Sequence, residues 1–254
     1  MARTFLVTLH YDGGRFAGWQ RQARERTVQA EFEAILERLC ERPVRVHAAG
    51  RTDAGVHAVG MATNCTLPDR WSTERLRKSL NSLLPTDCWA ESVREARAGF
   101  HARTKATGRC YRYVVGTDAL AASPFRRRYE WALGKALDQK LLAAAAVALS
   151  GEHDFHAFSV RRSPVTHRRC HIRMARWVER PAQAGFIFEI AANRFLHHMV
   201  RMLVGTMVDI GLGRRALSDM DRLLALDASV TTSPPAPARG LYFAAAEYPV
   251  ECFA

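Results

Sequence analysis

The stretch Gly50-Arg51-Thr52-Asp53-Ala54-Gly55-Val56-His57-Ala58 joins two runs that are typical of strands, Val44–Ala48 before it and Met61–Leu67 after it. Glycines on both sides of Asp53 favour a tight loop, because glycine adopts backbone conformations that other residues avoid. The loop presents one carboxylate beside the permanent positive charge of an arginine. This strand–loop–strand segment is therefore the first candidate for a reactive site.

Outward from this loop, the first hundred residues alternate between strand and helix patterns. We expect a strand at Thr4–Tyr11, a helix at Val28–Leu39, a helix that Ser72 or Thr73 caps and that runs to Leu83, and a strand at Trp89–Glu95. With the two strands around Asp53, the order is strand, helix, strand, strand, helix, strand. That order is typical of the split βαβ, or ferredoxin-like, unit.

The remainder of the chain repeats this order as a pattern, without a repeat of residues. We expect strands at Tyr111–Gly116 and Leu241–Tyr248, a hairpin of Cys170–Glu179 and Phe186–Ala192, helices at Asp138–Leu149 and from about Phe195 to Gly211, the latter capped by Asn193, and a short helix that Ser218 caps. The fold class is therefore α+β, with two ferredoxin-like halves, residues 1–105 and 106–254, and a central sheet that is mixed or antiparallel.

The charge balance indicates an anionic partner. The 254 residues contain 37 Lys and Arg against 25 Asp and Glu, a formal net charge of +12. Nucleic acid is the commonest partner of so basic a protein. Most of the positive charge is arginine, which contacts phosphate with two parallel hydrogen bonds and stacks on bases. A carboxylate displayed by such a chain suggests chemistry on a polyanion.

The cysteines and the N-terminus indicate a reduced, cytoplasmic protein. Six cysteines are scattered without a C-x-x-C pair, which argues against a zinc ribbon and against a disulfide framework. The chain enters a strand-like run directly after Met1, without the pattern of a signal peptide. No apolar run approaches the length that spans a membrane.

A second candidate is Phe100–Tyr113, in which basic and aromatic residues alternate. His101, Arg103, Lys105, Arg109 and Arg112 supply the basic side chains of this segment. In a strand from Arg109 to Val114, Arg109, Tyr111 and Tyr113 would share one face. Such a face suits stacking on an unstacked base while its phosphates are held. The residues also fit a solvated charge run beside ordinary core tyrosines.

A third candidate is Asn193–Gly211, which combines an apolar stripe with a stripe that contains Arg201 and Gly205. Gly205 would let another backbone approach closely. An arginine at the edge of a buried face needs an acidic partner, because an unpaired charge there is costly, and Asp53 would serve. The two histidines of the segment, His197 and His198, are expected to be structural. Asp53 itself also fits an Asx-turn or an ion pair.

Other chemistry finds little support in the sequence. His153 with His156, and His167 with Cys170 and His171, could be drawn as metal ligands, but neither set has a second cluster at familiar spacing. A phosphate-binding loop of the G-x-x-x-x-G-K-[ST] type, a G-x-G-x-x-G fingerprint and a G-x-S-x-G elbow are all missing from the sequence. We therefore expect neither nucleotide hydrolysis nor hydride transfer.

Taken together, these segments resemble the pseudouridine synthases, in particular the tRNA pseudouridine synthase A family. The stretches that carry the resemblance occur in family order over nearly the whole chain, and they are Tyr11-Asp12-Gly13, Gly18–Gln22, Val28-Gln29, Gly50–His57, Phe100–Arg103, Ala106-Thr107, Tyr111–Tyr113, Gly151–Phe155, His197–Gly205 and Gly240–Tyr242. The combination of GRTDAGVH with HHMVR downstream is specific, whereas each alone would be weaker.

The resemblance implies a role for individual residues. Asp53 corresponds to the catalytic aspartate that attacks the target nucleoside, and Arg51 to the arginine that helps to extrude the base. Tyr111 corresponds to the tyrosine that stacks on the target base, and Arg201 to the arginine that pairs with the catalytic carboxylate. Leu241 or Tyr242 lies on a C-terminal strand that lines the pocket.

The resemblance also implies the activity, which is conversion of uridine to pseudouridine at positions 38, 39 and 40 of the tRNA anticodon stem-loop. It implies a basic cleft between the halves, a homodimer, and neither cofactor nor metal. It leaves open whether Asp53 attacks C1′ or promotes a glycal route. Two alternatives from other classes are a non-catalytic RNA-binding module and a metal-dependent nuclease. The basic segment Arg161–Arg173 fits either an RNA clamp or a disordered loop.

Overall fold

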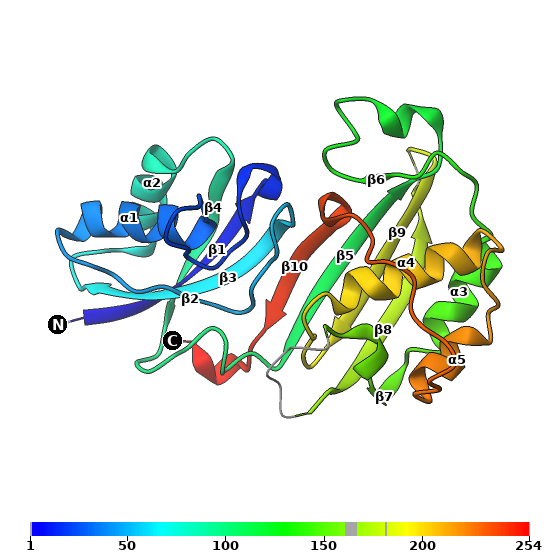
Figure 1. Cartoon of the computed structure of the whole chain (residues 1–254). Coiled ribbons are helices and arrows are strands. Elements are labelled where there is room, and N and C mark those ends of the chain that lie inside the picture. The colour runs from blue at the N-terminus through cyan, green and yellow to red at the C-terminus, as the bar shows by residue number, and fades with distance from the viewer. Residues whose placement is uncertain (1, 161–166, 181, 254) are drawn as a thin grey trace. The chain divides into compact units, whose positions relative to one another are not determined.

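The computed structural model describes residues 2–160, 167–180 and 182–253, and the chain forms two compact units (Figure 1). Unit 1 comprises Met1–Arg109 and Tyr242–Ala254, and unit 2 comprises Cys110–Leu241. Compared with the expected halves 1–105 and 106–254, the first unit extends slightly further and also contains the end of the chain. Part of the basic segment Arg161–Arg173 lies outside the described residues.

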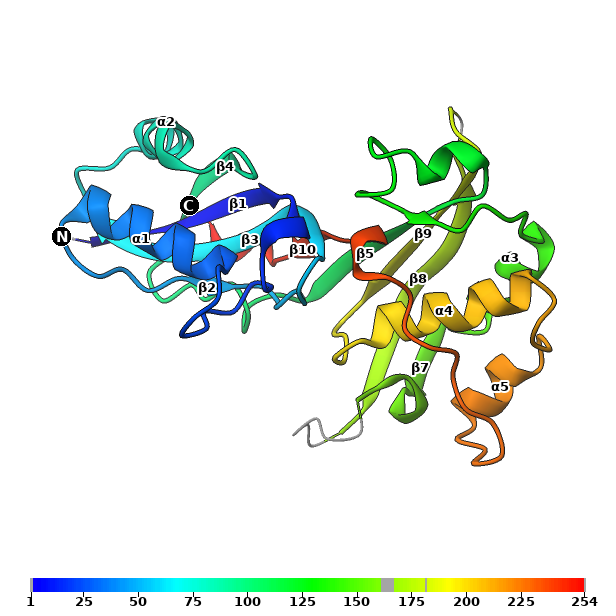
Figure 2. The ribbon, with the colours of Figure 1, turned by 45° about the horizontal axis from the view of Figure 1, so that its top comes forward.

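Unit 1 is a mixed sheet with two helices on one face (Figure 2). Its elements are β1 (Ala2–Tyr11), α1 (Val28–Cys40), β2 (His47–Ala48), β3 (His57–Pro68), α2 (Thr73–Leu83), β4 (Cys88–Ala96) and the part of β10 (Leu241–Glu247) that follows Leu241. The strand order is β4-β1-β3-β10. β1 is antiparallel to both neighbours, whereas β10 runs parallel to β3. The predicted order of elements is confirmed for this unit.

The helices of unit 1 begin where the sequence places them. Val28, Phe32 and Leu36 bury the apolar face of α1, as their spacing predicts. The hydroxyl of Ser72 accepts a hydrogen bond from the N–H of Arg75, so Ser72 caps α2. These two helices therefore follow from local sequence alone.

The strand predicted at Val44–Ala48 is wrong over most of its length, because only His47–Ala48 pairs with β3. Side chains of α1 form hydrogen bonds with backbone N–H and carbonyl groups that would otherwise pair with a neighbouring strand. The side chain of Glu33 accepts from the N–H of Val46 at 3.2 Å, and the side chain of Gln29 donates to the carbonyl of Val46 at 3.4 Å. Val44 and Val46 are nevertheless buried, which explains why the run looks like a strand.

Unit 2 contains the strands β5, β9, β8 and β7 in that order, with β6 beside β5, and α3 and α4 pack together on one face of these strands (Figures 1 and 2). The elements are β5 (Gly108–Gly116), β6 (Trp131–Ala132), α3 (Gln139–Val147), β7 (Gly151–Asp154), β8 (Arg169–Glu179), β9 (Gly185–Ala192), α4 (Met199–Gly211) and α5 (Asp219–Leu224). The predicted hairpin is β8 with β9, paired antiparallel. The sequence did not predict β6 and β7. Within the described residues, no helix has the length and apolarity to cross a bilayer.

Helix α4 begins later than predicted, at Met199 instead of about Phe195. Asn193 does not cap it, because the Asn193 side chain accepts from the N–H of His171 on β8 at 2.9 Å. His198 precedes the helix with a φ of 63°, a left-handed conformation that prevents the helix from extending backwards. Ser218 precedes α5, but its side chain makes no capping hydrogen bond.

Candidate active site

Asp53 lies in unit 1, half-buried in the loop that connects β2 to β3. The N–H of Val56 donates to the carbonyl of Asp53 at 3.1 Å, so the chain turns immediately after the acid. Gly55 allows this turn because its φ is +77°, where other residues are strained. Arg51, two residues before the acid, is exposed. The predicted tight loop is therefore present.

Two glycines let neighbouring backbone press against this loop. A Cβ on Gly18, whose φ is +100°, would lie 2.6 Å from the carbonyl oxygen of Thr52, and a Cβ on Gly13 would lie 2.0 Å from that of Val56. The N–H of Trp19 completes the contact by donating to the Thr52 carbonyl at 3.0 Å. Both glycines belong to motifs that carry the family resemblance, but nothing in the sequence indicates this supporting role.

The base of the loop rests on His57, which is 2% exposed. Its Nδ1 lies 3.1 Å from the backbone nitrogen of Gly13 and 3.2 Å from a carboxylate oxygen of Asp12. The imidazole stacks on the ring of Tyr242, with centroids 4.9 Å apart and planes 24° apart. Close by, the hydroxyl groups of Tyr11 and Thr52 lie 2.8 Å apart. Rigid, buried contacts thus fix both ends of the loop.

Three of the predicted RNA-contact residues, His101, Arg103 and Lys105, lie on a loop of unit 1 that β3 anchors. The Asn64 side chain donates to the carbonyl of Phe100 at 3.1 Å and accepts from the N–H of Ala102 at 2.7 Å. Arg103 and Lys105 of this loop are exposed, and His101 is half-exposed. The ring centroid of His101 lies 4.3 Å from that of His47. Burial, and then the charge of His101, lower the pKa of His47.

The Arg109 side chain supports that loop through hydrogen bonds to backbone carbonyl groups. Its guanidinium group donates to three carbonyl oxygens, those of Ala49 at 3.2 Å, Ala106 at 3.1 Å and Arg103 at 2.6 Å. The first of these residues leads into the Asp53 loop, and the other two belong to the anchored loop. The side chain therefore joins the two segments, and its contact with RNA stays a prediction.

In unit 2, the two tyrosines of strand β5 differ in how far their side chains are buried. Tyr111 is half-exposed and meets the ring of Phe195 edge to face, with centroids 5.0 Å apart. Tyr113 is fully buried, donates to the carbonyl of Pro237 at 2.7 Å, and has its pKa raised by that burial. Only Tyr111 therefore presents a ring that a nucleotide could reach. Arg112 is half-exposed.

Arg201 lies in the first turn of α4 and holds a crossing segment, residues 231–237, that we call the strap. Its Nε donates to the carbonyl of Ala236 at 2.7 Å, and the N–H of Ala236 donates to the carbonyl of Arg201 at 2.9 Å. A Cβ on Gly205 would lie 2.2 Å from the carbonyl oxygen of Pro234. The close backbone approach predicted at Gly205 is therefore confirmed. Leu241, beyond the strap, is buried.

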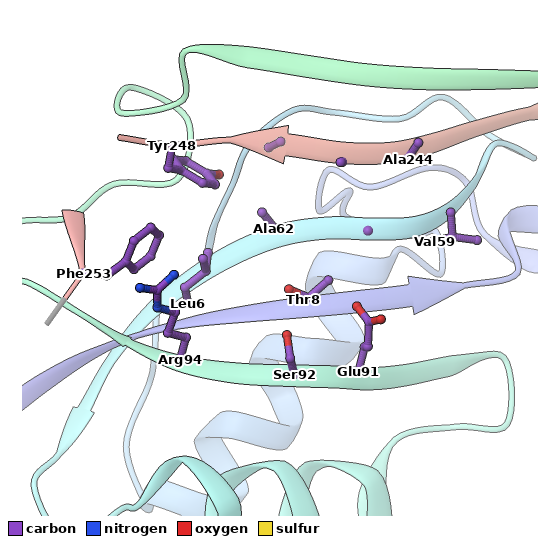
Figure 3. A pocket seen from close by; sticks show the side chains of 13 residues that line it. Leu6, Thr8, Val59, Ala62, Glu91, Ser92, Arg94, Ala244, Tyr248 and Phe253 are labelled. Carbon is purple, nitrogen blue, oxygen red and sulfur yellow. The ribbon is translucent and has the colours of Figure 1, made fainter. Parts of the chain in front are cut away.

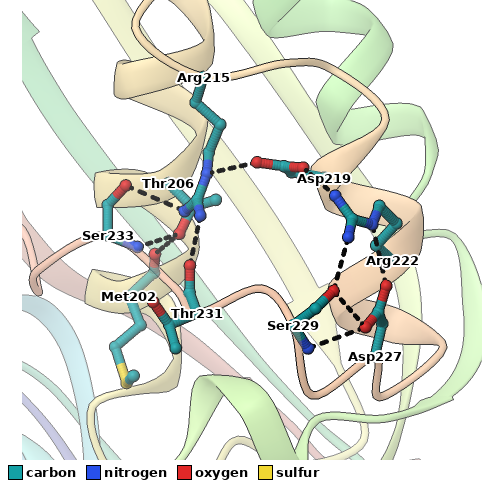
Figure 4. A network of polar contacts seen from close by, with 9 residues as sticks. All are labelled: Met202, Thr206, Arg215, Asp219, Arg222, Asp227, Ser229, Thr231 and Ser233. Atoms are coloured by element: carbon teal, nitrogen blue, oxygen red, sulfur yellow. Dashed lines mark hydrogen bonds and ion pairs between the residues drawn. The ribbon is translucent and has the colours of Figure 1, made fainter.

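A polar network holds the other end of the strap (Figure 4). Arg215 donates to Asp219 at 3.0 Å, to the hydroxyl of Ser233 at 3.3 Å and to the carbonyl of Thr231. The hydroxyl of Thr206 on α4 accepts from the N–H of Ser233 at 3.2 Å. These contacts fix the strap at one end, while Arg201 fixes it at the other.

A hollow of about 550 Å³ lies elsewhere in unit 1, across strands β4, β1, β3 and β10 (Figure 3). Its lining includes Glu91, Arg94 and Tyr248. The guanidinium carbon of Arg94 lies 3.8 Å from the centre of the Phe253 ring. Among the described residues, neither Arg51 nor Asp53 belongs to this lining, so we keep the hollow apart from the candidate site.

Comparisons with known proteins agree with the residue patterns. A family model described as tRNA pseudouridine synthase matches residues 8–104 and 145–249. A protein of Chlorobium luteolum is 41% identical over 249 residues, 97% of this chain and 96% of that protein. One of Moorella thermoacetica is 42% identical over 246 residues, 95% and 98% of the two chains. Both relatives are named tRNA pseudouridine synthase A. A chain in the crystal structure of a Cbf5-Nop10-Gar1 complex matches with a TM-score of 0.40 and 12% identity, over 82% of this chain and 44% of that one, too distant to bear on the fold.

Proposed function

This chain belongs to the tRNA pseudouridine synthase family, and we propose that it converts uridine to pseudouridine at positions 38, 39 and 40 of the tRNA anticodon stem-loop. The enzyme is thus an isomerase that acts on tRNA. The observation that carries the assignment of the site is the half-buried carboxylate of Asp53, displayed on a loop that Gly13, Gly18 and His57 hold.

The proposed reaction breaks the bond between C1′ of the ribose and N1 of uracil. Uracil then turns while bound, a bond forms between C1′ and C5, and the proton of C5 leaves while N1 gains one. Asp53 acts either as the nucleophile at C1′ or as the base that promotes a glycal route, in which it takes the proton of C2′ and returns it when the new bond forms. Since uracil is both the leaving group and the returning nucleophile, the reaction as proposed uses no cofactor.

The proposal gives four further residues a place around the extruded nucleotide. Arg51 helps to extrude the base, which costs a few kcal/mol of lost stacking. Tyr111 offsets part of that cost by stacking on the base, which its half-exposed ring supports. Arg201 pairs with the carboxylate of Asp53, and Leu241 lines the pocket.

The proposal extends to binding and assembly. In it, tRNA lies in a basic cleft between the N-terminal and C-terminal halves, and the enzyme is a homodimer in the cytoplasm. The exposed Arg103 and Lys105 support contact with phosphates near the Asp53 loop, together with His101, Arg109 and Arg112. Cysteines that are all free support a reducing compartment.

Release of tritium from C5 of uracil in tRNA transcripts tests the reaction. We expect release by the wild-type enzyme and none by Asp53→Asn, while the affinity for tRNA stays nearly unchanged. Glu37→Gln is the control, because it removes an exposed carboxylate from α1 of the same unit. Full activity of Asp53→Asn would refute the assignment of the nucleophile. A wild-type protein that binds tRNA without releasing tritium would indicate the RNA-binding module instead, and the comparisons do not favour that alternative.

A further inference from the structure

The segment between β5 and β6 projects beyond the end of the sheet of unit 2 (Figures 1 and 2) and displays apolar side chains in solvent. Phe125 is 89% exposed and Leu120 is 69% exposed. We call residues Ser123–Tyr129 the tip loop. A phenylalanine side chain that is almost fully exposed contributes little to the stability of the unit, because it buries little apolar area. Its presence at the tip therefore needs another explanation.

The tip loop is held from below by buried ion pairs. Arg126 contacts Asp118 at 2.9 Å and Glu130 at 2.9 Å, and Glu130 also contacts Arg180 at 2.6 Å. Glu130 is 2% exposed, and its carboxylate is pressed against Gly116, where a Cβ would lie 2.6 Å from Oε1. The two arginines and two carboxylates of this cluster balance one another's charge. The cluster thus fixes the loop without adding net charge.

The backbone of the tip loop is a compact turn that directs one side chain inward and leaves the others in solvent. The N–H groups of Arg126 and Arg127 both donate to the carbonyl of Ser123, at 3.0 and 2.8 Å, and the N–H of Tyr129 donates to that of Arg126 at 2.8 Å. In this turn Arg126 points to the buried cluster. Phe125, Arg127 and Arg128 are exposed. The exposed residues are therefore presented by a rigid support.

The chemistry of the exposed residues selects the partner. Residues 119–129 contain three arginines and no carboxylate. The guanidinium group of Arg128 lies 5.7 Å from the centre of the Tyr129 ring. An aromatic face beside guanidinium groups matches a nucleotide, whose base stacks and whose phosphate is anionic. An apolar protein surface would complement the phenylalanine but leave the arginine charges poorly solvated.

We propose that the tip loop is a second tRNA-binding surface, on which Phe125 stacks against a partly unstacked base and Arg127 and Arg128 contact flanking phosphates. This inference rests on the proposed function only in taking tRNA as the ligand. The surface supplies affinity for the substrate and takes no part in the isomerisation.

The stacking contact is tested by measuring the dissociation constant for a full-length tRNA transcript with Phe125→Ala and Phe125→Tyr. Phe125→Ala should weaken binding about five-fold or more, in line with the loss of one stacked base. Phe125→Tyr keeps the ring and should bind like the wild type. Neither change touches the core, since the side chain is exposed. If Phe125→Ala binds tRNA as tightly as wild type, or if it changes only the oligomeric state, the surface is not an RNA site.

The phosphate contacts are tested by the salt dependence of the same affinity. Arg127→Ala should reduce the slope of log affinity against log salt by about one, as expected for one lost phosphate contact. Lys140→Ala, which removes one exposed positive charge from α3 of the same unit, should leave the slope unchanged. Equal slopes for Arg127→Ala and wild type would overturn the proposal. A wild type that binds tRNA but forms no pseudouridine would refute the proposed function and leave this inference standing.

Discussion

Gly18 supports the proposed nucleophile from below although it carries no functional group. Its φ is +100°, and a Cβ added there would lie 2.6 Å from the carbonyl oxygen of Thr52. Gly18→Ala should therefore shift the Asp53 loop as well as strain the backbone, which costs on the order of 1–3 kcal/mol. We expect turnover to fall at least ten-fold while tRNA affinity changes little, as measured by tritium release and by binding.

Gly14 offers a matched control for this change. It lies in the same segment, but its φ is not positive, and an added Cβ would meet only the Asp12 side chain, at 3.0 Å. Gly14→Ala should retain near-normal turnover. Equal losses in the two variants would show that the segment as a whole, and not the contact under the Asp53 loop, sets the rate.

Buried thiols make the protein sensitive to alkali. Burial raises the pKa of Cys65 to about 12, from an ordinary value of 9.0. The unfolded chain therefore loses this proton from about pH 9, while the folded chain keeps it, so stability is fully present below pH 9 and falls as the pH rises towards 12. The loss is about 1.4 kcal/mol per pH unit for one such group.

The measurement is the free energy of unfolding in urea at several values between pH 8 and pH 11. Cys65→Ala should show a shallower decline than the wild type, by about one proton, even though the substitution lowers stability at every pH. The comparison uses slopes, so the cost of the cavity cancels. Parallel declines would contradict the attribution to Cys65. Burial also raises the pKa of Cys88 to about 12, so a double variant should be shallower still.

At the level of single residues, the sequence indicates candidate reactive groups more readily than the contacts that hold them. Asp53, Arg51 and Tyr111 stood out because their residue types and neighbours are unusual. Arg109 was grouped with the RNA contacts because a sequence shows charge but not hydrogen bonds. Its three carbonyl partners come from segments up to sixty positions apart, and no local pattern indicates them.

Among the elements, α4 and the strap are joined by hydrogen bonds at both ends of the strap. Arg215 fixes the strap through Thr231 and Ser233, and Arg201 fixes it through Ala236. Arg215→Ala should free the strap and so change the setting of the Arg201 guanidinium. We expect a lower kcat with little change in KM, in the same direction as Arg201→Ala but smaller, since Arg215 is a positioning residue.

Two variants separate this effect from general loss of structure. Arg215→Lys keeps a charge beside Asp219 and should restore part of the rate. Arg214→Ala removes the neighbouring arginine, which pairs only loosely with Asp209 at 3.4 Å, and should be close to wild type. A raised KM with an unchanged kcat in Arg215→Ala would point to RNA binding and contradict a positioning role.

The ends of the elements show where local signals are overridden by the tertiary structure. Helix α2 begins after Ser72 as predicted, because the Ser72 hydroxyl caps the first turn by accepting from the N–H of Arg75. The predicted cap of α4 fails, because the Asn193 side chain finds a partner on β8. The strand before Asp53 shrinks to two residues, because α1 takes its backbone partners. In the last two cases the prevailing contact comes from another element, so periodicity alone could not reveal it.

At the scale of the whole molecule, the order of elements in the first unit could be predicted, but not the return of the chain end to it. Residues from Tyr242 onward belong to unit 1. Tyr242 pairs with His57 in parallel register and stacks on its ring. Parallel pairing between such distant segments leaves no local mark in the sequence, because any apolar strand could make it.

Removal of the chain end tests how much unit 1 depends on it. A protein that ends at Leu241 loses the parallel partner of β3, the stack on His57 and the hydrogen bonds of Glu247 and Tyr248 to the loop of residues 102–107. A protein that ends at Tyr248 keeps all of these. We expect faster amide hydrogen exchange at His57 and Ala58, and in the anchored loop, only in the shorter protein.

The core of unit 2 serves as the internal reference for that experiment. Leu203 and Phe188 lie in a unit that ends at Leu241, so their amide protection should be similar in both truncated proteins. Since the Asp53 loop rests on His57, the shorter protein should also lose tritium release while the longer one keeps most of it. Uniform loss of protection in both units would mean that the chain end stabilises the molecule globally. Unchanged protection at His57 would show that β3 holds the base of the loop without its parallel neighbour.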